Sequence, residues 1–185
     1  MEIKVLLRQS LPLLILCGIG EIFAGLLFGG MVSFLNYLPG LIVLIPAIMG
    51  LKGNIDVTLG SRLGSAAHMG LISLGNTWNQ ETKQNVLASL SIGVIMAVIA
   101  GVLADITCRL LRLPTMGIPK LIGIALIAGT MAGVILAFLT VGIIMVAFKR
   151  GLDPDNITAP SLATVGDIIT LGCIFLTAWF FIEVI

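Results

Sequence analysis

Five long apolar stretches are the feature that most restricts how this chain can fold. They cover residues 10–37, 39–74, 86–111, 117–148 and 160–185. About 20 helical residues cross a hydrocarbon core roughly 30 Å thick, and each stretch exceeds that length. Because backbone groups in lipid must be hydrogen-bonded within their own segment, we predict an all-α integral membrane protein with five transmembrane helices.

The composition agrees with this prediction and excludes several other classes. Of the 185 residues, 58% are hydrophobic and 10% are charged, whereas soluble domains carry about 25% charged residues. An ordinary soluble enzyme, a disordered tail and a nucleic-acid-binding protein are therefore excluded. The connections between the stretches are short, so residues 1–185 are predicted to form a single transmembrane domain in the lipid bilayer, without a cytosolic sensor domain.

The basic residues that flank the stretches predict an orientation. With the N-terminus inside, the inner loops carry five basic residues and the outer loops carry three. The inner set is Lys4, Arg8, Lys83, Lys149 and Arg150, and the outer set is Arg109, Arg112 and Lys120. This difference favours a cytoplasmic N-terminus in an inner or plasma membrane. Because five spans cannot form two equal inverted halves, a symmetric pathway would require a homodimer.

Asp167 is the most informative ionisable residue within an apolar stretch. Such residues are costly in a membrane unless they are paired or line a watery path. Thr164 and Ala163 lie three and four residues before Asp167, on the same face of a helix. The nearest basic residue in the sequence, Arg150, lies outside the stretch. Either a cation path or an ion pair with another helix would explain this carboxylate.

The second stretch is unusually polar in its middle. Pro46, Gly50 and Gly53 predict a broken second helix, whose freed carbonyl groups would be hard oxygen ligands for a cation. Lys52 and Asp56 are four residues apart, so they could equally well pair with each other.

The other intramembrane charges leave more than one interpretation open. Glu21 and Asp105 could be hydrogen-bonded packing residues or sites for a coupling ion, and Arg62 fits an anchor near a membrane face. No P-loop, paired metal-binding cysteines or hydrolase triad is present, so the chain is not predicted to be an enzyme. The available oxygen donors suit Mg²⁺ or Ca²⁺ better than softer metals.

Two motifs give the chain a resemblance to the membrane domain of the MgtE magnesium channel family, and above all to its eukaryotic solute-carrier relatives. Residues 45–62, IPAIMGLKGNIDVTLGSR, resemble the family's P-A-x-x-G-x-x-G-N signature in its solute-carrier form. Residues 151–155, GLDPD, resemble the turn before its last helix, and Pro160, Thr164 and Asp167 match its P-x-x-x-T-x-x-D pattern.

This resemblance implies a homodimer that transports divalent cations, above all Mg²⁺, through a path lined by the second and fifth helices. Asp167 falls on the pore aspartate of the family, and two copies would face each other across the dimer axis. The resemblance implies that the ion is held by Asp167, by carbonyl groups near Gly53 and Asn54, and by Ala163 or Thr164. Asp56, an extra acidic residue near this path, is the sixth predicted metal-site residue. Mg²⁺ would remain largely hydrated there, because it sheds water reluctantly.

The chain also departs from the family pattern. Bacterial MgtE has a small neutral residue and a glutamine where this chain has Asp56 and Thr58. The extra carboxylate suggests a Na⁺ or H⁺ coupling site, so a Na⁺-coupled Mg²⁺ exchanger is an alternative to a channel. A non-transporting scaffold subunit is a further alternative. The cytoplasmic sensor domains of MgtE are not expected in this chain. Gating by such domains would therefore require a separate regulatory subunit.

Overall fold

A computed structural model of the chain describes residues 3–73, 75–151 and 154–184. Within these residues it contains six helices: α1 (Ile3–Gly30), α2 (Val32–Tyr37), α3 (Leu41–His68), α4 (Gln80–Leu110), α5 (Ile118–Lys149) and α6 (Pro154–Val184). All except the short α2 are long and apolar enough to cross a membrane. The prediction of an all-α protein with five membrane-spanning helices is thus confirmed.

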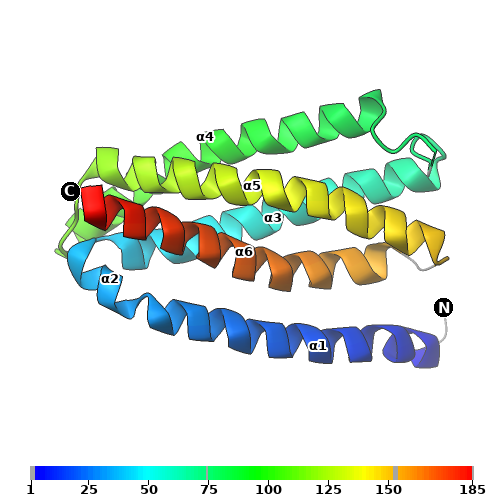
Figure 1. Cartoon of the computed structure of the whole chain (residues 1–185), viewed down its shortest axis with the longest axis horizontal. Coiled ribbons are helices and arrows are strands. Elements are labelled where there is room, and N and C mark those ends of the chain that lie inside the picture. The colour runs from blue at the N-terminus through cyan, green and yellow to red at the C-terminus, as the bar shows by residue number, and fades with distance from the viewer. Residues whose placement is uncertain (1–2, 74, 152–153, 185) are drawn as a thin grey trace.

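The five long helices lie side by side in one bundle (Figure 1). The N-terminus and the α3–α4 connection lie at one end of the bundle, and α2 and the C-terminus lie at the other. Helix α6 packs against α1, α3 and α5, and α3 also packs against α4 and α5. The second and fifth spans, α3 and α6, are therefore direct neighbours.

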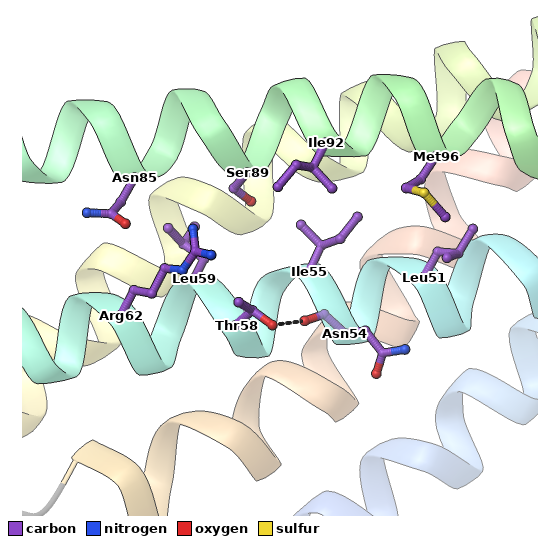
Figure 2. Close-up of a pocket in the computed structure, with 10 residues that line it drawn as sticks. All are labelled: Leu51, Asn54, Ile55, Thr58, Leu59, Arg62, Asn85, Ser89, Ile92 and Met96. Atoms are coloured by element: carbon purple, nitrogen blue, oxygen red, sulfur yellow. Dashed lines mark hydrogen bonds between the residues drawn. The ribbon is translucent and has the colours of Figure 1, made fainter.

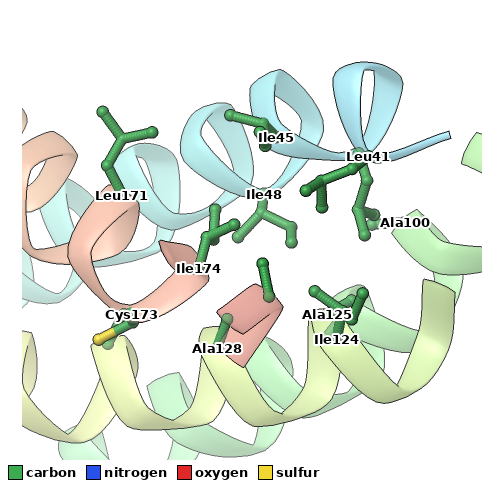
Figure 3. Packing of buried hydrophobic residues seen from close by; sticks show 14 of the residues in the cluster. Leu41, Ile45, Ile48, Ala100, Ile124, Ala125, Ala128, Leu171, Cys173 and Ile174 are labelled. Atoms are coloured by element: carbon green, nitrogen blue, oxygen red, sulfur yellow. The ribbon is translucent and has the colours of Figure 1, made fainter. Parts of the chain in front are cut away.

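Small side chains allow α4 and α5 to pack closely. Both helices contribute buried alanines to one core cluster: Ala97, Ala100 and Ala104 on α4 and Ala125, Ala128 and Ala132 on α5. At Gly101, a Cβ atom would lie only 2.8 Å from the backbone of Ile122. Close backbone approach increases van der Waals contact between the helices. This contact is important in a membrane, because the hydrophobic effect does not drive helices together in lipid. Figure 3 shows the neighbouring part of this core, where Ala125 and Ala128 meet Ile48 of α3 and Ile174 of α6.

The prediction of a broken second helix is wrong, because α3 runs without interruption from Leu41 to His68. Pro46 is its sixth residue, so its missing N–H removes one helical bond near the start, that to the carbonyl group of Ile42. Glycine in a helix interior costs only about 1 kcal/mol. A break in lipid would expose several backbone groups at several kcal/mol each, which outweighs the cost of Gly50 and Gly53.

Helices α4 and α6 begin about six residues before the apolar stretches that predicted them, and α1 begins at Ile3 rather than near residue 10. Helix α4 begins at Gln80 rather than near residue 86, because the side chain of Asn79 accepts a hydrogen bond of 3.0 Å from the backbone N–H of Thr82. Helix α6 begins at Pro154 rather than at Pro160. Proline is favoured in the first turn of a helix, where its missing N–H has no intrahelical partner to lose.

Candidate cation-binding groove

A groove between α3 and α6 brings together the polar residues of the two motifs. Its lining residues are Met49, Gly50, Gly53, Asn54, Val57, Thr58, Ala163 and Asp167, and its volume is about 590 Å³. The six α3 residues have the spacing of one helix face, and Ala163 and Asp167 are one turn apart on α6. No described neighbour lies within 4 Å of where a Cβ would stand on Gly50 or Gly53, so both glycines widen the groove.

Oxygen atoms are the polar ligands that this groove offers. Asp167 is half-buried, whereas Asn54 and Thr58 are exposed in the single chain. The hydroxyl group of Thr58 donates a hydrogen bond of 2.7 Å to the backbone carbonyl of Asn54. Figure 2 shows this bond and shows the Asn54 amide pointing away from α4. A carboxylate, an amide oxygen and a hydroxyl group are hard ligands, which suit Mg²⁺ or Ca²⁺.

Four of the six predicted metal-site residues lie together in this groove. They are Gly53, Asn54, Ala163 and Asp167. Thr164 does not line it: its side chain is buried and packs closely against Gly20 of α1. Asn54 and Asp167 of the predicted set therefore line the groove, whereas Thr164 lies in the contact between α6 and α1.

Asp56 lies in the interior rather than in the groove. Its Oδ1 atom is 3.1 Å from Nζ of Lys52, and the two residues are 1% and 5% exposed. The paired arrangement, one of the two left open by the sequence, is therefore the one found. Lys52 also lies close to Gly133 of α5, where a Cβ would stand 3.1 Å from Nζ. The Oδ2 atom of Asp56 has no hydrogen-bond partner among the described residues.

Asp105 has a structural role at the other end of the bundle. Its Oδ2 atom accepts a bond of 2.6 Å from Nε of Arg109, and its Oδ1 atom accepts a bond of 2.7 Å from the hydroxyl group of Thr115. Thr115 in turn accepts a bond from the backbone N–H of Gly117, where α5 begins. Asp105 therefore stabilises the α4–α5 turn through these hydrogen bonds. Of the two roles that the sequence left open for Asp105, the structure supports that of a hydrogen-bonded packing residue.

Sequence reasoning did not assign Thr58 to the site, although the signal was present. Thr58 lies four residues after Asn54, so the two share a helix face. Glu21, the other carboxylate for which the sequence leaves a coupling-ion site open, lies in an adjoining groove between α1, α3 and α6, which shares Met49 with the groove of Asp167. Glu21 itself is exposed in the single chain.

The fold and the groove define a class: a helical, multi-pass membrane protein with a groove between two of its spans that contains an aspartate, an asparagine and a threonine. The sequence profile of the MgtE family, described as divalent cation transporters, matches residues 45–177. The chain belongs to the MgtE family, as its two motifs predicted.

Vertebrate solute carriers are among its relatives. The chain is 31% identical to rat solute carrier family 41 member 3 over 182 residues, which cover 94% of this chain and 38% of the relative. It is 31% identical to human solute carrier family 41 member 2 over 184 residues, which cover 95% of this chain and 31% of that relative. The chain thus spans about a third of the length of these relatives.

Proposed function

We propose that this chain carries Mg²⁺ across a membrane as a homodimer, through a path lined by α3 and α6. The observation that carries the proposal is the groove in which Asp167 of α6 meets Asn54 and Gly53 of α3. Membership of a family described as divalent cation transporters supports the same activity.

The size and ligands of the groove suit a hydrated ion. Six water molecules occupy about 180 Å³ at roughly 30 Å³ each, and the groove measures about 590 Å³. Asp167 would attract the ion, and Asn54 and Thr58 would accept hydrogen bonds from its water shell. Hard oxygen ligands around a hydrated ion favour Mg²⁺ over softer metals.

The position of the groove supports the proposed dimer. Asn54, Thr58 and Ala163 are exposed in the single chain, so the groove has an open side that its own helices leave uncovered. A second copy facing this side would enclose the path and place its own Asp167 opposite the first. Two carboxylates about one axis attract a divalent cation and repel each other without it.

Mg²⁺ uptake by proteoliposomes that contain the purified full chain tests the proposal. Asp167→Ala is expected to abolish uptake while the protein remains folded and dimeric by gel filtration and cross-linking. Glu183→Gln removes one negative charge from an exposed position near the end of α6, and this control should retain wild-type uptake.

Three results would contradict the proposal. Uptake by Asp167→Ala at the wild-type rate would refute the assigned path. Uptake that follows an imposed Na⁺ gradient would replace the passive path with a Na⁺-coupled exchanger. Binding is measured independently, because a ligand of the native state raises the melting temperature. A wild-type chain with neither flux nor a melting shift at millimolar Mg²⁺ would be a scaffold subunit.

A further inference from the structure

A second cavity lies between α3 and α4 and shares Asn54 and Thr58 with the groove of Asp167. Its volume is about 220 Å³, and it is lined by Leu51, Asn54, Ile55, Thr58, Leu59, Arg62, Asn85, Ser89, Ile92 and Met96. We name it the Arg62 pocket, and Figure 2 shows its lining residues. We propose that the Arg62 pocket binds one anionic phospholipid, with the phosphate group at Arg62 and an acyl chain along the apolar wall.

The pocket has a polar end towards the end of the bundle and an apolar end towards its middle, which is the order of headgroup and acyl chain in a membrane lipid. Arg62, Asn85 and Ser89 line the end near the α3–α4 connection, and Leu51 and Met96 line the end near the middle of the bundle. Arg62 and Leu51 are eleven residues apart, which corresponds to about 16 Å along a helix. One leaflet of the hydrocarbon core is about 15 Å thick, so the pocket runs the depth of one leaflet.

The depth of Arg62 suits a phosphate group. Arg62 lies six residues before the end of α3 at His68, or about 9 Å along the axis. A helix of 28 residues is about 42 Å long and extends roughly 6 Å beyond each side of a 30 Å core. The Cα atom of Arg62 therefore lies near the edge of the hydrocarbon, and its long side chain can reach the headgroup layer.

The charge of this end favours an anion. The ion pairs among the described residues are Lys52–Asp56 and Arg109–Asp105, so Arg62 has no carboxylate partner there. Lys83, Lys149 and Arg150 are exposed at the same end of the bundle. A guanidinium group binds phosphate through paired, charge-assisted hydrogen bonds. A free guanidinium group within a basic end of the bundle therefore selects an anionic headgroup over a zwitterionic one.

Two further polar groups complete the headgroup end. Ser89 is buried, and Figure 2 shows its hydroxyl group directed from α4 towards α3. The amide nitrogen of Asn85 donates to the backbone carbonyl of Glu81 at 3.0 Å and to the Glu81 carboxylate at 3.1 Å. These bonds use the amide nitrogen of Asn85 and leave its amide oxygen to accept a bond from a headgroup hydroxyl. A glycerol phosphate headgroup supplies both a phosphate group for Arg62 and a hydroxyl group for Asn85.

Native mass spectrometry of the full chain, released from detergent after incubation with phosphatidylglycerol, tests this proposal. The wild type is expected to retain one phosphatidylglycerol and to retain phosphatidylcholine of the same chain length more weakly. Arg62→Gln should weaken retention about tenfold or more, because a charge-assisted contact is lost. Lys83→Gln is the matched control, since it removes one exposed positive charge from the same end outside the pocket, and it should bind as the wild type does.

A second variant tests occupation of the pocket separately from the charge of Arg62. Ser89→Phe fills the pocket while Arg62 is kept, and it should lower the retention of both lipids. Because Arg62 is exposed, Arg62→Gln should keep the wild-type elution volume and helix content. Equal retention by the wild type and Arg62→Gln would overturn the proposal, as would equal retention of the two lipids. An Arg62→Gln chain that dissociates into monomers with unchanged lipid would show that the pocket receives a second copy instead.

Discussion

Lys52→Met is expected to destabilise the protein more than most single substitutions. It removes the only described partner of the Asp56 carboxylate, which is 1% exposed and already has one oxygen atom without a hydrogen bond. Removing one member of a buried ion pair costs about 3–5 kcal/mol. On the scale of soluble chains of similar length, about 2–4 °C per kcal/mol, the melting temperature should fall by roughly 6–20 °C.

The assay is thermal unfolding in detergent, followed by circular dichroism and by the fraction of protein that remains soluble. The double variant Lys52→Met with Asp56→Leu is the control, because replacing both members of a buried pair with apolar residues of similar volume is often neutral. It should regain most of the lost stability. A single variant that melts within 2 °C of the wild type, or a double variant less stable than the single one, would refute the reasoning about the pair.

The same double variant also tests whether Asp56 belongs to the ion path. Asp56 faces Lys52 in the interior and does not line the groove of Asp167. If the double variant folds, Mg²⁺ uptake should therefore continue. Loss of uptake with unchanged stability would instead return Asp56 to the list of metal-site residues, where sequence reasoning placed it.

Two glycine substitutions separate packing from transport. Gly101→Ala should lower stability by about 1–3 kcal/mol in thermal unfolding, because the new Cβ would meet the backbone of Ile122 at 2.8 Å. Gly93→Ala on the same helix has no described neighbour within 4 Å, and a loss of stability there equal to that at Gly101 would contradict this explanation. Gly53→Leu should keep the wild-type melting temperature but reduce Mg²⁺ uptake severalfold, since it adds bulk only to the groove. Unchanged uptake would show that the ion does not pass Gly53.

The sequence was most informative where one element could be interpreted without its neighbours. Hydropathy predicted the five spans, because each apolar stretch in lipid must satisfy its own backbone hydrogen bonds as a helix. The sequence was misleading about α3, because Pro46, Gly50 and Gly53 predicted a break that the helix does not have. It also placed the starts of α4 and α6 too late, because capping by Asn79 and the position of Pro154 extend these helices beyond their apolar parts.

The inward face of α3 could not be predicted from its own residues. In a soluble helix the apolar face marks the side that is buried. In a membrane helix apolar residues face lipid as well as protein, so an apolar face does not show which side of the helix is buried in the protein. Spacing placed Lys52 and Asp56 together, and also Asn54 and Thr58, without showing which pair faces a cavity.

The sequence by itself determined the number of spans and the family, and it named candidate residues for a cation site. It did so because hydrophobic length and motif spacing are properties of single segments. Only the tertiary structure decided which of those residues meet. Packing of α3 against α4, α5 and α6 turns Asp56 inward to Lys52 and leaves Asn54 facing Asp167. Rotation of a helix about its own axis is set by its neighbours' shapes, and these come from distant parts of the chain.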